Sequence, residues 1–352
     1  MLSFTRYTLF EEIPEKLLPG IIKIRIEGEE DYNYPLDVTT TDEETELNAM
    51  KVPPHPDSRI ITIVGHHDDH VVALGTLRLN IGSHNRNNAS IMVRVLSSER
   101  RKGYGWAILE KLVQEIPEEV DILFFQILPQ YREFYEYIEK YPVKLGMIER
   151  KSASDLRKFN LPEVRSKAAE LRRNAEEQGY EFIKIRDFEF PEEFNLNAYM
   201  KVLEQIWNDM PSEDLSFEDE RINERHFEVM KERIKASGTH NWLIVCIEKE
   251  TGYPVGMTDI FFDYRFPELL YQGDTGVIRE HRGKRLGLTL KYLMLEEILS
   301  DKKLKDAKYI QTHNAHSNEP MIRINNELGY EEVALLREYE IRKDDLFKIL
   351  RN

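Results

Sequence analysis

The sequence has one cysteine, Cys246, which lies in the apolar run WLIVCI. A single cysteine excludes a disulfide within the chain and is typical of a reducing compartment, so we expect a cytoplasmic protein. The strand-like neighbours predict that Cys246 is a buried strand residue and not a nucleophile. The chain also lacks an uninterrupted run of about 18 apolar residues, so the sequence predicts no membrane-spanning helix.

An excess of positive charge is absent as well. The formal net charge is −15, which argues against binding to nucleic acid or to an anionic membrane, because both need a basic face. The first residues, MLSFTRYTLFEEIPEKL, contain acidic residues too early for a secretory signal. The 352 residues are 41% hydrophobic and 32% charged. This balance and length predict a globular protein of two domains.

The chain does contain a repeated glycine loop. RRKGYG occupies residues 100–105 and RGKRLG occupies residues 282–287, so the loops are 282 − 100 = 182 positions apart. Each loop enters an amphipathic helical pattern and follows a strand-like run, ASIMVRVL at 89–96 or LLYQGDTGVI at 269–278. The two stretches are therefore interpreted as copies of one strand, loop and helix unit.

The order of elements around the loops repeats too. Two helical stretches and two strand-like runs precede each loop, and a strand and another helix follow the loop's helix. Thr41 with Glu44, and Ser216 with Asp219, are predicted helix starts in the first and second copy. We therefore predict a duplicated domain, with an N-terminal domain at 1–155 and a C-terminal domain at 156–352.

A strand that ends in a basic, glycine-containing turn before a helix presents several backbone N–H groups, and the positive end of the helix dipole, to one point. That geometry suits a pyrophosphate. Neither loop is a Walker A motif, because GxxxxGK[ST] is missing, and neither follows the first strand of a βαβ unit, as a Rossmann loop would. The sequence thus predicts an anion site of another type.

Both loops resemble the [QR]-x-x-G-x-[GA] signature of the GNAT superfamily of acyl-CoA-dependent N-acyltransferases. RRKGYG satisfies the signature fully, whereas RGKRLG has Arg285 in place of its first glycine. The segment THNAHSNEPMIRINNELGY, at 312–330, resembles the strand and helix that close the acyl-CoA cleft. The second half further resembles tandem acetyltransferases of the mycothiol synthase-like subgroup, over most of residues 180–341. The likeness of residues 1–150 is weaker.

The resemblance implies an α/β (α+β) fold with two GNAT-like domains, each a twisted, mixed, mostly antiparallel sheet flanked by helices. It also implies that acetyl-CoA enters a splay between the fourth and fifth strands of a domain. Only glycine readily adopts a positive φ, but Arg285 can still donate its backbone N–H if its φ is negative, so the second loop is interpreted as functional. The expected acetyl-CoA ligands are Val277, Arg282, Gly283, Lys284, Arg285, Leu286, Gly287, Leu288, Asn314 and Asn318, with Val95, Arg100, Arg101, Lys102, Gly103, Tyr104 and Gly105 in the first copy.

Acetyl transfer needs a neutral amine, so a base must remove a proton. The resemblance implies a carboxylate on the fourth strand, which makes Asp274 the candidate base, with Asp259 brought near by a hairpin and Gln272 on the same face by alternation. The family's tyrosine acid is replaced by Asn325 in the second copy, while the first copy keeps Tyr135 but offers no carboxylate. The C-terminal domain is therefore the predicted catalyst, with the alternative that Asp274 only hydrogen-bonds its neighbours.

The predicted function is transfer of an acetyl group from acetyl-CoA to a primary amine of a small molecule or peptide, by a monomer or homodimer. The alternative is a non-catalytic acyl-CoA-binding or regulatory protein with a degenerate site. HHDDH, at 66–70, has metal-ligand side chains but is predicted to be a hairpin turn, and we expect no metal. The acidic stretch MPSEDLSFEDE, at 210–220, is interpreted as a lid or a capped turn.

Overall fold

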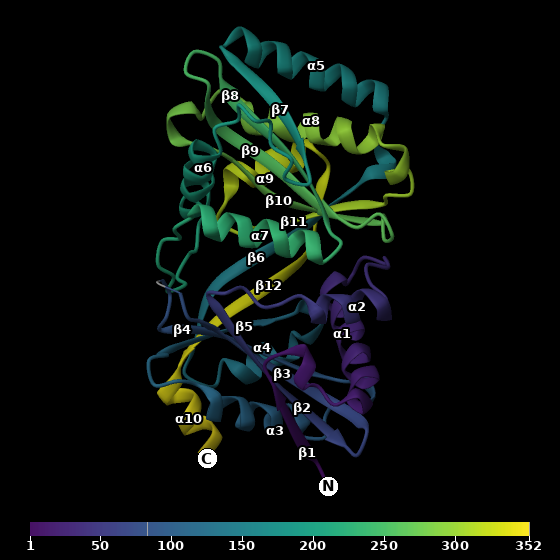
Figure 1. Cartoon of the computed structure of the whole chain (residues 1–352), viewed down its shortest axis with the longest axis vertical. Helices are drawn as coiled ribbons and strands as arrows, with labels where there is room; N and C mark the ends of the chain where they lie inside the picture. Colours follow the sequence, from purple (N-terminus) through teal and green to yellow (C-terminus); the bar gives the residue numbers. More distant parts are fainter. Residues whose placement is uncertain (83, 352) are drawn as a thin grey trace.

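The computed structural model describes residues 1–82 and 84–351 and contains one continuous twelve-stranded sheet (Figure 1). The strands are β1 (Ser3–Tyr7), β2 (Ser58–His67), β3 (His70–Asn80), β4 (Asn88–Val95), β5 (Ile122–Ile127), β6 (Val143–Asp155), β7 (Tyr180–Arg186), β8 (His240–Glu248), β9 (Tyr253–Phe262), β10 (Leu269–Val277), β11 (Tyr309–Ala315) and β12 (Tyr330–Arg342). The α-helices are α1 (Leu18–Asn33), α2 (Glu43–Lys51), α3 (Tyr104–Leu112), α4 (Glu133–Ile138), α5 (Leu161–Glu177), α6 (Leu196–Asn208), α7 (Glu224–Ala236), α8 (Leu286–Ser300), α9 (Glu319–Glu327) and α10 (Lys343–Arg351).

The sheet consists of two similar halves. Strands β1 to β4 and strands β7 to β10 are antiparallel neighbours, as expected for strands joined by short connections. The next strand is parallel in both halves, and it pairs over only three residues, from Asn88 in β4 and from Leu269 in β10. Beyond these pairs the two parallel strands separate, so each half has the predicted splay. The predicted fold class is confirmed.

The halves exchange their last strands. The sheet order is β1-β2-β3-β4-β5-β12-β6-β11-β10-β9-β8-β7, so β12 pairs with β5 of the first half, and β6 pairs with β11 of the second half. Helix α10 follows β12 and packs Leu346 into the core of the first half. Both ends of the chain therefore lie at the same end of the molecule (Figure 1). The domain boundary at residue 155 remains a prediction, and strand pairing crosses it.

The core is divided by the sheet and by the two halves. In the first half one cluster lies between the strands and α3, around Ile108 and Leu112, and another between the strands and α1, around Ile21 and Ile24. In the second half α8 is apolar on nearly all sides, because it is covered by the sheet on one side and by α5 on the other (Figure 1). Cys246 is buried in β8, as predicted, and burial raises the pKa of its thiol to about 12.

Across residues 1–82 and 84–351, the helices are all too short or too polar to cross a lipid bilayer.

Candidate functional site

The two glycine loops are held at the ends of β4 and β10 by equivalent arginines. Arg282 Nε donates to Val277 O (2.8 Å) and its Nη2 donates to Asp209 Oδ2 (2.5 Å). In the first copy Arg100 Nε donates to Val95 O (3.1 Å) and its Nη2 donates to Asp31 Oδ2 (3.0 Å). Each arginine thus closes the turn from strand to helix and ties it to an acidic residue at or just beyond the end of a preceding helix.

Both loops use a left-handed backbone at the same two positions. In the first copy these residues are Arg101 (φ 66°) and Gly103 (φ 83°), and in the second they are Gly283 (φ 80°) and Arg285 (φ 62°). The condition of a negative φ at Arg285 is therefore not met. Glycine adopts this region freely, whereas an L-residue there costs about 1–2 kcal/mol. Each copy thus has an arginine at one left-handed position and a glycine at the other.

The second loop borders open space. Thr289 N–H donates to Arg285 O (3.0 Å), so the N–H groups before it belong to the first turn of α8, where no intrahelical acceptor exists. A Cβ at Gly283 would meet no atom within 4 Å. A cavity of about 420 Å³ lies between this loop and the end of α5; it is lined by Leu171, Asn174, Glu177, Gln178, Gly283, Lys284, Arg285 and Thr289. This geometry fits an anionic ligand such as a pyrophosphate.

In the first loop, each basic side chain already has an acidic neighbour. Arg101 pairs with Glu133, and Lys102 Nζ donates to Glu99 Oε2 (2.9 Å). Tyr104, the first residue of α3, has its hydroxyl 3.0 Å from His67 Nε2.

Lys284 of the second loop instead donates to the hydroxyl of Tyr180, while Arg285 lies 3.8 Å from Glu327 Oε2. Leu286 and Leu288 are buried in the core, and Gly287 faces Ile324 of α9. The second loop is therefore less fully paired with carboxylates than the first.

The fourth strands of the two halves differ, because β10 contains a β-bulge and β4 does not. Strand β10 has nine residues and β4 has eight, and the pairing of β10 with β9 shifts between Gln272 and Thr275. The pairing of β4 with β3 has no shift. The additional residue places the backbone of Gly273 beside Asp259: a Cβ at Gly273 would lie 2.4 Å from Asp259 Oδ1. A side chain larger than hydrogen would thus not fit there without displacing the carboxylate.

Asp259, which is buried, and Asp274, which is partly buried, form a carboxylate pair at this bulge. Trp207 Nε1 of α6 donates to Asp274 Oδ2 (2.7 Å), and Asn241 Nδ2 lies 3.5 Å from Asp259 Oδ2. Asp259 Oδ1 is buried and has no hydrogen-bond partner among the described residues. Burial and the neighbouring charge of Asp274 raise the pKa of Asp259, and burial raises the pKa of Asp274. Proximity of the two carboxylates, which the sequence predicted, is confirmed.

Tyr199 of α6 is a further buried neighbour of this pair. Burial and the charges of Asp259 and Asp274 raise the pKa of its hydroxyl, so it stays protonated. Neither Tyr199 nor Trp207 was identified from the sequence. Their only signal is the apolar face of the helix between Asn195 and Asn208, which also fits an ordinary core.

Gln272 does not share a face with Asp274, and that part of the prediction is wrong. Gln272 Nε2 donates to Asp259 O (2.5 Å) and Thr258 Oγ1 (3.0 Å), and its side chain lines a cavity of about 10 Å³ beneath α8. Asp274 contacts α6 instead. The bulge explains the difference, because an additional residue breaks the alternation of side chains along a strand.

The same small cavity contains Lys291, a lysine on an otherwise apolar side of α8. Its Nζ donates to Asn325 Oδ1 (2.7 Å) and lies 5.0 Å from the centre of the Tyr330 ring. Burial without a carboxylate partner lowers the pKa of Lys291 to about 7. One signal for this group was overlooked in the sequence, namely a single charge inside the helical run LGLTLKYLML.

Asn325 occupies the position at which the sequence analysis expected an acid. Its Nδ2 donates to Asn314 Oδ1 (2.8 Å) on β11, so Asn314 ties α9 to the strand. Asn318 caps α9 by accepting from Met321 N–H (3.3 Å). Tyr135 lies in the other half; its hydroxyl is 3.5 Å from Ile127 O, and burial raises its pKa.

Metal-ligand side chains occur at two places. The HHDDH segment is a hairpin, as predicted, with Asp68 and Asp69 between β2 and β3. Its histidines have separate partners: His66 contacts Thr5, His67 contacts Tyr104, and His70 contacts Glu99.

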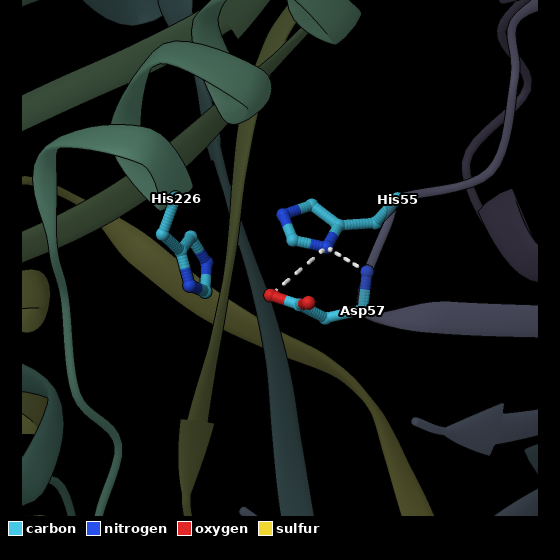
Figure 2. A group of neighbouring side chains, drawn as sticks. All are labelled: His55, Asp57 and His226. Atoms are coloured by element: carbon cyan, nitrogen blue, oxygen red, sulfur yellow. Dashed lines mark hydrogen bonds and ion pairs between the residues drawn. The ribbon is translucent and has the colours of Figure 1, made fainter. Parts of the chain in front are cut away.

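The second place is a cluster that the sequence did not indicate. Among the described residues, His55, Asp57 and His226 are the group of histidine and acidic side chains whose ligand atoms could hold one metal ion (Figure 2).

The acidic stretch at 210–220 contacts the first half of the molecule. Asp214 N–H donates to Gly146 O (2.9 Å), Ser216 N–H donates to Glu340 Oε2 (3.1 Å), and Phe217 stacks on Phe124. The predicted helix start at Ser216 is wrong, because α7 begins after Asn223, which accepts from His226 N–H. This segment joins the halves at the exchanged strands.

Several solved structures share the fold of this chain. A tandem GNAT protein from the clavulanic acid biosynthesis pathway superimposes with a TM-score of 0.72 at 16% identity, covering 97% of this chain and 99% of its own. A GCN5-related N-acetyltransferase from Sphaerobacter thermophilus gives a TM-score of 0.57 at 13% identity, covering 97% and 96%. A putative acetyltransferase from Pyrococcus horikoshii gives 0.51 at 12% identity, covering 96% and 89%.

No protein-family model and no curated protein sequence matches the chain. Similarity at such low identity concerns the arrangement of the elements. The chain has the fold of a tandem GNAT protein, with two GNAT-like halves joined in one mixed, mostly antiparallel sheet.

Proposed function

We propose that the C-terminal half transfers an acetyl group from acetyl-CoA to a primary amine of a small molecule or peptide. The observation that carries this proposal is the bulge in β10, the strand that leads into the second glycine loop. The bulge brings Asp274 of this strand next to the buried Asp259 of β9. The equivalent strand of the first half has neither the bulge nor a carboxylate. The fold of the solved GNAT proteins supports acetyl-CoA as the donor.

In this mechanism Asp274 accepts the proton that the amine must lose before it attacks the thioester carbonyl. A carboxylate whose pKa is raised by burial is a stronger base than one in water, and Trp207 fixes its orientation. Asp259 shares the site and holds the second charge close, which raises the affinity of the pair for one proton. The attack forms the amide bond, breaks the carbon–sulfur bond and releases the CoA thiolate.

Acetyl-CoA would be held by the second loop. The N–H groups of the loop and of the first turn of α8, from Gly283 to Leu288, would face the pyrophosphate, and Lys284 and Arg285 would add positive charge beside the cavity. Val277 ends the strand along which the pantetheine would lie. Asn325 cannot supply a proton, so the thiolate would leave without a tyrosine acid.

The first experiment compares acetyl-CoA binding, by calorimetric titration, in the natural protein, Gly287→Glu and Gly105→Glu. A glutamate in the first turn of a helix places negative charge where the pyrophosphate would bind. We expect Gly287→Glu to abolish binding and Gly105→Glu to leave one site intact. Loss of all binding in Gly105→Glu alone would assign the donor site to the first half and make Tyr135 the residue to test.

Release of free CoA thiol from acetyl-CoA, measured with a panel of amines, separates an enzyme from a binding protein. We expect amine-dependent release by the natural protein. Tight acetyl-CoA binding without release for any amine would favour the alternative, a regulatory acyl-CoA-binding protein.

A further inference from the structure

A cluster of two imidazoles and a carboxylate lies where the two halves of the chain meet, outside both loop sites. His55 and Asp57 precede β2 in the first half, and His226 is in the first turn of α7 in the second half. Figure 2 shows the three side chains pointing into one shared space. Each offers a ligand atom, and these atoms all lie within 4.8 Å of one another. Residues 171 positions apart (226 − 55) are thus brought together only by the fold.

The backbone around the cluster is well held. Asp57 O accepts from Ile81 N–H (2.8 Å), and Asp57 N–H donates to His55 Nδ1 (3.1 Å). Arg233 of α7 donates to Pro53 O, which ties the helix to the segment that carries His55. The imidazoles of His55 and His226 have ring centres 4.9 Å apart. The positions of the ligands therefore follow from contacts that do not involve an ion.

His55 has an unsatisfied ring nitrogen. Nδ1 accepts from Asp57 N–H, and Nε2 is buried and has no partner among the described residues. Nε2 offers a lone pair to an ion in the tautomer that carries its proton on Nδ1, so binding at Nε2 exchanges the hydrogen bond from Asp57 N–H for a bond to the ion. Neutral imidazole is the form that binds metal ions.

We propose that His55, Asp57 and His226 bind one dication of the zinc class, such as Zn²⁺ or Co²⁺. Two imidazoles and one carboxylate are a donor set that such ions accept, with a remaining position for water. Tetrahedral ligands at zinc distances lie about 3.3 Å apart, so the three groups must close by up to about 1.5 Å. Half of the Asp57 side chain is exposed, and His226 is only partly buried, so rotation of these side chains is unobstructed by core packing.

The bound ion would join the segment before β2 to α7 and so clamp the two halves together. The guanidinium groups of Arg225 and Arg233 lie close enough to affect His55 and would oppose the ion, whereas Asp57 would attract it. The expected affinity is therefore moderate. A ligand that binds only the folded protein stabilises it, and saturation with Zn²⁺ should raise the midpoint of thermal unfolding by roughly 5 °C.

The test uses the full chain after removal of metal with a chelator. Co²⁺ is titrated while its visible absorption is recorded, Zn²⁺ is added to displace it, and thermal unfolding is measured with and without Zn²⁺. The variants are His226→Ala and His55→Gln. The matched control is the double variant His67→Ala/His70→Ala, which removes two histidines from the HHDDH hairpin and leaves the cluster intact.

We expect one Co²⁺ per chain in the natural protein and in the hairpin control, displaced by Zn²⁺, with at least a tenfold loss of affinity in both cluster variants. The thermal shift should disappear with the binding. Binding that survives in His226→Ala and is lost in the hairpin control would assign the metal to HHDDH and overturn the proposal. Absence of Co²⁺ binding to the natural protein would overturn it as well, and leave the cluster as a contact between the halves.

Discussion

In both halves the fourth strand packs closely against a preceding helix, β4 against α1 and β10 against α6, and a glycine makes room for the contact. The glycine is on the strand in one half and on the helix in the other. In the second half the strand supplies the glycine: a Cβ at Gly276 would lie 2.5 Å from Ile206 of α6, so helix and strand approach closely. In the first half the helix supplies it, and the Arg94 guanidinium of β4 lies against Gly28 of α1. Arg94 and Gly276 occupy equivalent positions, 182 residues apart (276 − 94), as the loops do.

This difference determines which side chains lie beside the fourth strand of each half. Close approach of α6 brings Trp207 Nε1 to Asp274, and the bulge leaves room for Asp259 beside Gly273. In the first half the space beside α1 is filled by an arginine that pairs with Glu29 (3.8 Å). The two loops therefore have the same backbone conformation, whereas the side chains beside them differ. The loop depends on backbone geometry, and the chemistry next to it depends on individual side chains.

The sharpest test of this comparison is Asp274→Asn, for which we expect a fall in turnover of roughly 100- to 10,000-fold with acetyl-CoA affinity unchanged. Asparagine can still accept from Trp207 but cannot take a proton. Met92, three residues before Val95 as Asp274 is three before Val277, is exposed and provides the matched control. Equal turnover in Asp274→Asn and Met92→Asn would refute the assignment of the base.

Lys291 offers the second test, because Leu109 occupies its equivalent position in α3, 182 residues earlier (291 − 109). The folded protein loses the Lys291 proton at pH about 7, and an unfolded lysine loses it near 10.5. The unfolded chain thus binds more protons in this window, and stability should rise with pH from about 7 to 10.5.

We expect Lys291→Leu to be more stable than the natural protein at pH 6, by a few kcal/mol, and this advantage to shrink as the pH rises. Denaturant unfolding at several pH values measures it. Lys151, whose pKa burial lowers to about 8, adds to the rise in both proteins, so the difference between them isolates Lys291. An advantage that is constant with pH would contradict a buried, titrating lysine.

The close approach of helix and strand can be tested with a pair of alanines. Gly276→Ala should destabilise the protein by about 1–3 kcal/mol, because the new methyl group overlaps Ile206. Gly28→Ala meets only the end of the flexible Arg94 side chain, within a helix that favours alanine, so its effect should be small or stabilising. The midpoints of thermal unfolding give the comparison, and a larger loss in Gly28→Ala would reverse it.

The smallest effect is expected in the loops themselves. Arg285→Gly and Arg101→Gly each remove an unfavourable left-handed residue, so each should stabilise the protein by about 1 kcal/mol. Gly103→Arg and Gly283→Arg place a side chain in open space but at positive φ, and should cost a similar amount. Denaturant midpoints report these changes. Different changes in stability for the equivalent substitutions in the two halves would contradict the equivalence of the loops.

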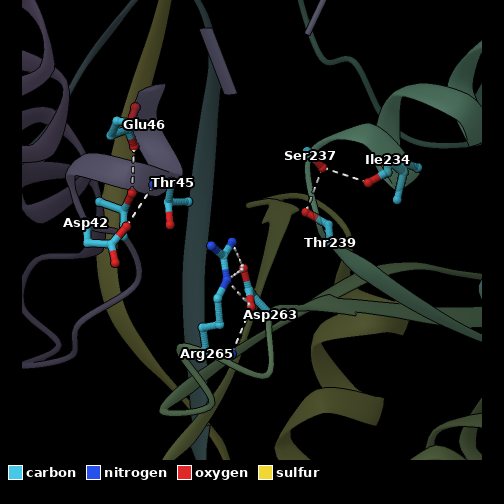
Figure 3. Close-up of polar contacts among 9 residues, drawn as sticks. Asp42, Thr45, Glu46, Ile234, Ser237, Thr239, Asp263 and Arg265 are labelled. Carbon is cyan, nitrogen blue, oxygen red and sulfur yellow. Dashed lines mark hydrogen bonds and ion pairs between the residues drawn. The ribbon is translucent and has the colours of Figure 1, made fainter. Parts of the chain in front are cut away.

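The repeated loop and its surroundings could be predicted from the sequence because they depend on local rules. A basic glycine turn between an apolar strand and an amphipathic helix needs few contacts from elsewhere, and the two halves and most strands followed from it. The splays were expected only from the resemblance to the GNAT superfamily. Helix starts were less certain. Asp42, and not Thr41, lies at the start of α2, where its carboxylate accepts from Thr45 N–H (2.7 Å; Figure 3). Neighbouring residues of similar capping ability cannot be ranked without the path of the chain.

The candidate site was predictable only in part. The proximity of Asp259 and Asp274 could be predicted because hairpin pairing is a local consequence of two adjacent strands. The predicted face of Gln272 was wrong because a one-residue bulge moves the following side chains to the other face of the strand. Such a bulge is not visible in the pattern of hydrophobic residues. Lys291, Trp207 and the His55 cluster depend on contacts between elements far apart in the chain.

The sequence by itself determined the duplicated strand, loop and helix units and the acidic pair on adjacent strands, since each follows from spacing within a short segment. The tertiary structure alone decided that β6 and β12 change places, that β10 bulges and β4 does not, and that His226 meets His55. Those outcomes depend on competition among long-range pairings and on side-chain volumes at contacts between elements. Such quantities exist only once the chain is folded.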